Sequence, residues 1–120
     1  MAGPALIHQG DVFWLSAEEP SGSEPGYRRP FVIVQNSLGN GSRLATTLAC
    51  ALTTKVALAS WPGNVLLGLG EANLPHASVV VVSSLTAFDK SRFEEWIGRV
   101  SLPVLRRVVR GVEQLIAPPG

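Results

Sequence analysis

The residues best suited to chemistry in this sequence are one glutamate and two adjacent arginines near the N-terminal end. Glu24 is followed by Arg28 and Arg29, and Pro30 comes directly after them. A carboxylate can take a proton from a hydroxyl, and a guanidinium can hold two phosphate oxygens at once. Together these groups could carry out phosphoryl transfer without a metal ion. From this spacing alone, a surface ion pair is the commoner outcome.

Cleavage of RNA would need few protein groups, because RNA brings its own nucleophile, the 2′-hydroxyl. The protein must supply a base, a cation for the non-bridging oxygens and a donor for the leaving 5′-oxygen. Glu24 is the candidate base and Arg29 the candidate cation, while Thr53 offers a hydroxyl donor at the end of a later strand. Pro30 favours an extended backbone at Arg29, which places this arginine at the root of a strand.

Two apolar runs with the character of strands flank the loop that carries these groups. The first extends from Gly10 to Leu15 and alternates its side chains between two faces. The loop at residues 17–26 is broken by proline and glycine and has no apolar period. The second run starts at Pro30 and is almost continuously apolar to Val34, which is typical of a strand buried on both faces.

The rest of the chain predicts more strands and one helix. Residues 36–42 have the composition of a polar turn, and four consecutive valines indicate a buried central strand. Ser101 and Pro103 suit the start of a helix whose apolar face recurs to residue 116, with arginines opposite. We therefore expect one domain, residues 1–120, that is mainly β: a small antiparallel barrel closed by a C-terminal helix. The further strands are predicted at residues 44–52, 65–69, 79–82 and 96–100.

Composition limits the possible functions. With 46% hydrophobic residues the 120-residue chain can form a core, and its single cysteine, Cys50, excludes an internal disulfide. No membrane span or signal peptide is predicted, which favours the cytoplasm. The net charge of +1 argues against a non-specific coat for duplex DNA, so any nucleic-acid contact would depend on a local cluster. Candidates for that cluster are Arg28, Arg29, Arg43 and Lys55.

Other chemistry-bearing residues give weaker signals. His8, His76 and Cys50 lack metal-ligand spacing, so neither a metal nor another cofactor is expected. The three tryptophans could stack on bases, but core packing is the expected role of each, with Trp61 the best exception because it lies in a turn. The arginine face of the helix is expected to be a solvated surface.

These motifs occur in an order that resembles the MazF/PemK family of bacterial toxin–antitoxin endoribonucleases. The resemblance covers about residues 8–116. Its most specific part is the opening, where Gly10-Asp11, Gly22-Ser23-Glu24, Arg29-Pro30 and Val34-Gln35-Asn36 follow one another at the family's spacing. Leu52-Thr53 is similar to the family's strand-end threonine motif, and residues 78–82, 85–93 and 97–101 resemble its late strand, the following turn and the entry to its last helix.

The resemblance implies a small SH3-like barrel, shared with the CcdB gyrase poisons, and cleavage of single-stranded mRNA at a short sequence. Products would carry a 2′,3′-cyclic phosphate and a 5′-hydroxyl. A homodimer would hold RNA in a groove across its interface, and a MazE-like antitoxin with an acidic disordered tail would fill that groove. The matching catalytic residues are Arg29, Thr53 and, as base, Glu24; Ser23, Arg28 and Asn36 would contact RNA.

Some positions depart from the family's pattern. Ala51 stands where a proline often precedes the Leu/Ile-Thr pair. Ser83 and Ser84 replace an acidic residue and a glutamine that are expected to help read bases, so Ser84 is a candidate RNA contact that would alter the recognised sequence. The PemK branch uses a histidine and an aspartate, and His8 could occupy the nearby position.

A second class of function uses the same barrel without catalysis. A CcdB-like toxin binds and poisons a protein target such as gyrase, and it needs neither an arginine nor a threonine in a catalytic position. The presence of both Arg29 and Thr53 therefore favours the endoribonuclease.

Overall fold

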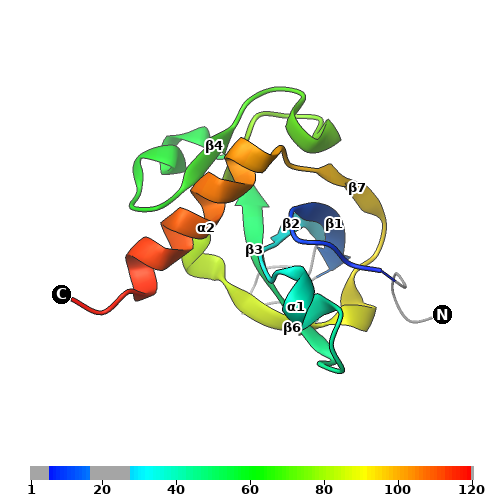
Figure 1. The fold of residues 1–120 in the computed structure, drawn as a ribbon. Coiled ribbons are helices and arrows are strands. Elements are labelled where there is room, and N and C mark those ends of the chain that lie inside the picture. The colour runs from blue at the N-terminus through cyan, green and yellow to red at the C-terminus, as the bar shows by residue number, and fades with distance from the viewer. Residues whose placement is uncertain (1–5, 17–27, 120) are drawn as a thin grey trace, which may run out of the picture.

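The computed structural model describes residues 6–16 and 28–119, which form a sheet and two helices. Antiparallel strands make up most of the fold, and the long C-terminal helix lies across one side of them (Figure 1). The strands are β1 (Asp11–Ser16), β2 (Arg28–Ile33), β3 (Thr46–Thr53), β4 (Val65–Leu67), β5 (Ser78–Val80), β6 (Thr86–Asp89) and β7 (Trp96–Arg99), and the helices are α1 (Ser37–Asn40) and α2 (Leu102–Ile116).

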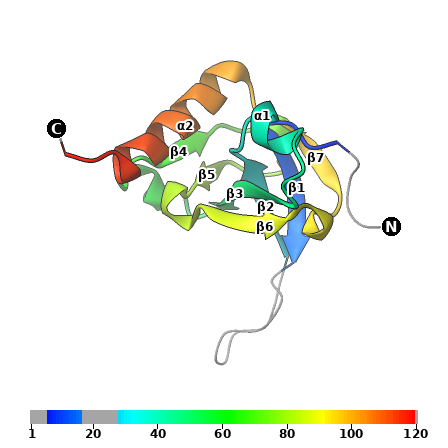
Figure 2. The ribbon, with the colours of Figure 1, turned by 60° about the horizontal axis from the view of Figure 1, so that its bottom comes forward.

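The strands join into one curled sheet in the order β4-β5-β3-β2-β1-β7, with β6 paired to β3 beside that path. Figure 2 shows β6 running along the side of the sheet remote from α2. The predicted mainly β fold with a C-terminal helix is confirmed. Since β3 pairs with β2 on one edge and with β5 and β6 in turn on the other, it is the strand around which the sheet curls.

Alternation along β1 divides the core into two clusters, as the sequence predicts. Val12 lies in the cluster beneath α2, together with Val104 and Val108 of that helix. Phe13 and Leu15 point the other way, into a cluster that includes the aromatic ring of Phe93. The helix buries its valines and exposes its arginines, so burial of one apolar stripe fixes α2 on the sheet.

Two glycines let α2 approach the turn before β4 backbone to backbone. Gly63 adopts φ +78°, a left-handed conformation that other residues rarely take. A Cβ on Gly111 would overlap the carbonyl oxygen of Gly63, and a Cβ on Gly63 would lie 2.7 Å from the carbonyl oxygen of Gly111. Larger residues at either position would therefore push the helix away from the sheet.

The four-valine run forms a buried interior strand only at Val79 and Val80, so the predicted extent of this strand is wrong. β5 ends at Val80, and residues 82–84 form a 3₁₀ turn before β6 begins. β5 lies between β4 and β3, next to the edge of the sheet. The break is stabilised from β3, because the Ala51 N–H donates to Ser84 Oγ at 2.7 Å and the Val81 N–H donates to the Ala51 carbonyl at 3.0 Å.

Smaller differences from the predictions have local causes. The predicted polar turn at 36–42 contains α1, because the side chain of Asn36 accepts hydrogen bonds from the N–H groups of Leu38 and Gly39 and so caps a helical turn. Ser101 precedes α2 as predicted but makes no side-chain cap; its own N–H donates to Glu71 Oε2 at 2.7 Å. Trp96 is 53% exposed rather than in the core.

Candidate active site

A pocket of about 270 Å³ brings together three of the predicted site residues, Arg28, Arg29 and Thr53. β2 and β3 pair with Phe31 opposite Ala51, and continuing this register by two residues brings Arg29 level with Thr53. Strand pairing, rather than sequence proximity, therefore places the guanidinium and the hydroxyl in one pocket. Among the residues that the structure describes, its lining is Trp14, Arg28, Arg29, Pro30, Leu52, Thr53, Thr54, Leu74, Pro75, His76 and Ser78.

Arg28 forms the outer wall of this pocket and is held from two sides. Its Nε donates to Glu94 Oε1 at 2.9 Å, and its guanidinium lies over the ring of Trp14 at 5.0 Å from the ring centre. A hydrogen bond from Ser16 and the nearby Arg28 lower the pKa of the Glu94 carboxyl, which stays charged near neutral pH. Arg28 thus keeps a fixed orientation while its side chain remains half exposed.

The neighbouring Arg29 lies deeper and Thr53 faces it from β3. Arg29 is half-buried at the start of β2, between the β1 and β3 sides of the sheet, and its Cα partner in β1 is Leu15. The Thr53 hydroxyl oxygen accepts a hydrogen bond from the Lys55 N–H at 3.2 Å. That bond uses the oxygen as acceptor and orients the hydroxyl, whose hydrogen can then be donated to a ligand.

Glu24 and Ser23 lie outside the described residues, so the predicted base and one predicted RNA contact stay predictions. Arg28, the first described residue after them, begins β2 at the pocket.

His76 also lines the pocket, and the sequence analysis missed it. The segment before β5 positions it: Leu74 is buried in the core, and Ser78 Oγ donates to the His76 carbonyl at 3.0 Å. No sequence spacing marks it: His76 reaches the pocket because it lies just before β5, which pairs with the end of β3 through Val79 and Thr53.

Two predicted RNA contacts lie away from the pocket. Asn36 follows the far end of β2, where its side chain caps α1. Ser84 donates to the Val81 carbonyl at 2.6 Å and accepts from Ala51, so its hydroxyl completes the sheet at the break between β5 and β6. Both contacts with RNA stay predictions. In the structure each of the two side chains forms hydrogen bonds with backbone groups.

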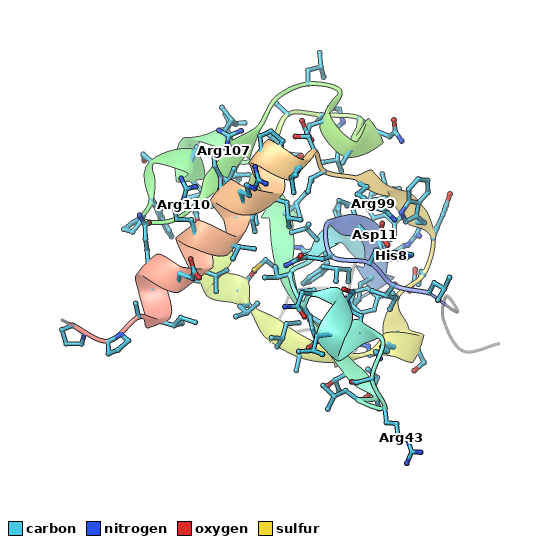
Figure 3. All side chains as sticks on the ribbon, in the orientation of Figure 1. His8, Asp11, Arg43, Arg99, Arg107 and Arg110 are labelled. Atoms are coloured by element: carbon cyan, nitrogen blue, oxygen red, sulfur yellow. The ribbon has the colours of Figure 1, made fainter. Side chains whose placement is uncertain are left out.

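His8 lies at the opposite end of the sheet from the pocket, beside a buried carboxylate. Figure 3 shows His8, Asp11 and Arg99 gathered near the start of β1. Asp11 is 2% exposed and accepts hydrogen bonds from Trp96 Nε1 at 3.2 Å and Arg99 Nε at 2.8 Å. Gly10 donates to the Ile33 carbonyl at the end of β2 remote from Arg28. This cluster ties β7 to β1.

The other predicted basic residues do not join the pocket. Arg43 projects from the turn between α1 and β3 (Figure 3), and neither it nor Lys55 lines the cavity of Arg29 and Thr53.

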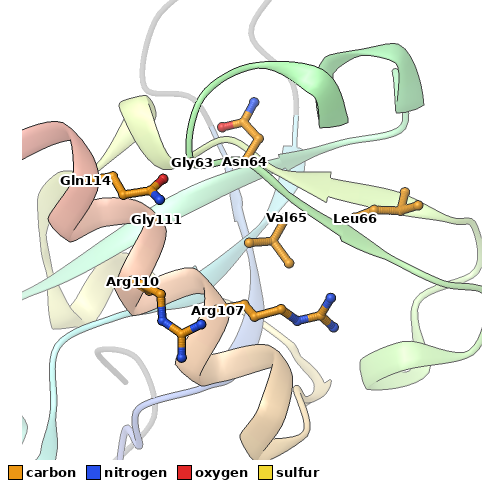
Figure 4. A pocket seen from close by; sticks show the side chains of 8 residues that line it. All are labelled: Gly63, Asn64, Val65, Leu66, Arg107, Arg110, Gly111 and Gln114. Carbon is orange, nitrogen blue, oxygen red and sulfur yellow. The ribbon is translucent and has the colours of Figure 1, made fainter.

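A second pocket, of about 250 Å³, lies between α2 and the segment around β4 (Figure 4). Arg107 and Arg110 line it from the helix, together with Gln114. The side chain of Asn64, which also lines it, is already bonded to the Leu58 carbonyl at 3.0 Å and the Val82 N–H at 3.0 Å. This pocket offers positive charge, but no carboxylate, imidazole or hydroxyl is among its described lining residues, which therefore lack the groups for proton transfer.

Residues 6–16 and 28–119 show neither a metal-binding cluster nor a helix that could span a membrane. No three His, Cys, Asp or Glu side chains come together there in a way that could hold a metal ion. Neither helix of this part of the chain has the length and apolar character to cross a bilayer.

Comparison with known proteins shows the class of protein to which this chain is similar. The chain matches the family of PemK-like, MazF-like toxins of type II toxin–antitoxin systems over residues 8–116. It is 35% identical over 111 residues to the endoribonuclease MazF6 of Mycobacterium tuberculosis H37Rv, covering 92% of this chain and 97% of that protein. MazF of Staphylococcus saprophyticus is 28% identical over 108 residues, or 90% of this chain and 89% of that one.

Solved structures agree on the fold. The MazE–MazF structure (Form-II) of Deinococcus radiodurans superposes with a TM-score of 0.76 at 22% identity, covering 97% of this chain and 100% of that one. A mycobacterial endoribonuclease in complex with its cognate antitoxin gives 0.75 at 19% identity, with 95% and 98% covered. This chain belongs to the PemK/MazF toxin family, as the sequence motifs predict. The predicted enzyme class agrees with the endoribonuclease names of its relatives, which do not favour the gyrase-poison alternative.

Proposed function

We propose that this protein is a metal-independent, sequence-specific endoribonuclease toxin that cleaves single-stranded mRNA and leaves 2′,3′-cyclic phosphate and 5′-hydroxyl ends. The observation that supports this best is the meeting of Arg29 and Thr53 in one pocket across the β2–β3 pair. A guanidinium and a hydroxyl at one phosphate stabilise the charge that develops on its oxygens during transesterification.

Each residue has a distinct role in this proposal. Arg29 donates a bidentate pair of hydrogen bonds to the two non-bridging oxygens, and Thr53 donates a hydrogen bond to the reacting phosphate. Glu24, from the loop before β2, takes the proton of the 2′-hydroxyl so that O2′ can attack phosphorus. Because RNA supplies the nucleophile and the protein supplies the charge, no step requires a metal ion.

RNA specificity comes from contacts around the phosphate. A net charge of +1 supplies little generic attraction for a polyanion, so base edges and stacking must provide much of the affinity. Arg28 stands at the mouth of the pocket for such contacts, with the ring of Trp14 beneath its guanidinium. We assign further contacts to Ser23, Asn36 and Ser84.

The active form in this proposal is a homodimer in the cytoplasm, neutralised by a MazE-like antitoxin with an acidic, disordered tail. Structures of related toxins bound to an antitoxin support the proposal that this protein has an antitoxin partner. Apolar side chains left exposed at the two ends of α2, Leu102, Leu115 and Ile116, offer surface for contacts between chains. An acidic tail would complement the arginines of the pocket where RNA binds.

The direct test is digestion of a long RNA in EDTA, followed by mapping of the new ends. Cleavage at one short sequence is expected, with 5′ ends that accept a phosphate from a kinase without prior phosphatase treatment. A strict requirement for a divalent ion, or 5′-phosphate products, would contradict the proposal. Loss of gyrase activity with intact RNA would support the CcdB-like alternative instead.

A further inference from the structure

Among the described residues that line the pocket of Arg29 and Thr53, His76 is an ionisable residue to which the proposed roles assign no function. This inference rests on the proposed function, because it concerns the last proton transfer of the same reaction. When the P–O5′ bond breaks, the departing oxygen must receive a proton, and a positioned acid speeds such a step by about 10²–10⁴-fold.

The other polar side chains that line the pocket from the described residues are poor sources of this proton. A guanidinium is a poor proton donor near neutral pH, so Arg28 and Arg29 do not suit this role. The hydroxyls of Thr53, Thr54 and Ser78 donate hydrogen bonds without giving up the proton near neutral pH. A histidine, by contrast, changes its charge between roughly pH 5 and 8, so it can both release and regain a proton.

The fold holds His76 at the pocket while leaving its ring open to water. On one side Leu74 is 4% exposed and its N–H donates to the Glu71 carbonyl at 3.1 Å. On the other side Ser78, also 4% exposed, begins β5, pairs with Leu67 of β4 and donates its hydroxyl to the His76 carbonyl. The His76 side chain is exposed, so solvent can return the proton after each turnover.

We propose that His76 is the general acid of the reaction. The base removes the 2′-hydroxyl proton, O2′ forms a bond to phosphorus, and the P–O5′ bond breaks with its electron pair on O5′. Protonated His76 gives its ring proton to O5′, so the products are the 2′,3′-cyclic phosphate, a 5′-hydroxyl and neutral imidazole. Water reprotonates the ring, and no oxidant, reductant or metal is consumed.

The charges around His76 make the pH dependence interpretable. Among the described lining residues the charged groups are Arg28 and Arg29, and a guanidinium in general keeps its charge across the neutral range. Glu94, which lies behind Arg28, has a lowered pKa and is already charged at neutral pH. Because a neutral imidazole cannot act as an acid, the wild-type rate should fall as the pH rises, and His76→Ala should lack this fall.

The decisive test compares ordinary RNA with an RNA whose scissile 5′-bridging oxygen is replaced by sulfur. A thiol has a pKa of about 8.5, so the thiolate leaves without a proton and needs no general acid. His76→Ala is expected to cleave ordinary RNA roughly 10²-fold or more slowly, yet to cleave the sulfur-substituted RNA within about tenfold of the wild type. His8→Ala, which changes the chain's other histidine at the far end of the sheet, is the matched control and should leave both rates unchanged.

A third variant separates proton donation from charge. His76→Arg keeps a cation but cannot release a proton, so it should be as slow as His76→Ala on ordinary RNA. Restored cleavage by His76→Arg, a wild-type rate for His76→Ala on ordinary RNA, or a defect that sulfur does not relieve would each overturn the assignment. Failure of the wild type to cleave any RNA would instead contradict the proposed function itself.

Discussion

Replacing Gly111 by alanine should destabilise the protein, because α2 approaches the turn before β4 too closely for a side chain. The added Cβ would overlap the carbonyl oxygen of Gly63, and it would also lie 3.0 Å from that carbonyl carbon and 3.2 Å from Val82 Cγ1. Gly63 cannot easily yield, since its left-handed backbone closes the turn. The helix must therefore move outward and loosen the contacts of Val108 and Val112, which are 0% and 7% exposed.

The expected change in the free energy of unfolding is the balance of opposing contributions. Overpacking of this kind costs about 1–3 kcal/mol, and loosened contacts beneath the helix add to it. Alanine gains up to about 1 kcal/mol over glycine in helix propensity, which offsets part of the loss. We expect a net loss of about 2 kcal/mol in the free energy of unfolding, which lowers the thermal midpoint by roughly 8 °C in a chain of this size.

Urea and thermal unfolding followed by circular dichroism measure this effect, at one protein concentration for all variants, since association would shift the midpoint. Gly68→Ala is the matched control, because a Cβ there has no heavy atom within 4 Å. That substitution should be neutral or stabilise by up to about 1 kcal/mol. If Gly111→Ala is as stable as Gly68→Ala, the close packing of α2 on the turn is wrong.

Two further predictions concern the hydrogen bond of Ser84 and the buried thiol of Cys50. Ser84→Ala should lower the free energy of unfolding by about 1–3 kcal/mol, because the Ala51 N–H loses its acceptor, whereas the exposed Ser83→Ala should change it by less than about 0.5 kcal/mol. Equal urea midpoints for the two variants would contradict the role of Ser84 in the sheet. Burial raises the pKa of the Cys50 thiol to about 12, so iodoacetamide at pH 8.5 should alkylate the urea-unfolded chain readily and the native protein hardly at all. Rapid alkylation of the native protein would contradict the burial of Cys50. Because folding favours the neutral thiol, the contribution of Cys50 to stability is complete below pH 9 and is lost as the pH rises toward about 12.

The sequence predicts the parts of this fold that depend on local periodicity. The alternation along β1 places Val12 and Phe13 in separate clusters, and the apolar spacing of α2 buries Val104, Val108 and Val112. These patterns need no knowledge of the partner element.

Features that depend on strand pairing could not be predicted in this way. The valine run breaks after Val80 because β3 changes partner from β5 to β6, and the Ser84 hydroxyl fills the gap. For the site, local sequence pointed to Arg29 and Thr53 separately, but only the register of β2 on β3 joins them. His76 reaches the same pocket through the pairing of β5 with β3, which no spacing in the sequence encodes.

The central claim is that the pocket of Arg29 and Thr53 cleaves RNA without a metal. The most direct test is the single-turnover cleavage rate in EDTA of an RNA carrying the mapped site, for Arg29→Ala, Thr53→Ala and Thr53→Ser. Arg107→Ala, in the second pocket, is the control. Loss of charge stabilisation predicts rates lower by about 10²–10³-fold for Arg29→Ala and similarly for Thr53→Ala, while Thr53→Ser and Arg107→Ala stay near the wild type. A folded Arg29→Ala variant that cleaves at the wild-type rate would contradict the account.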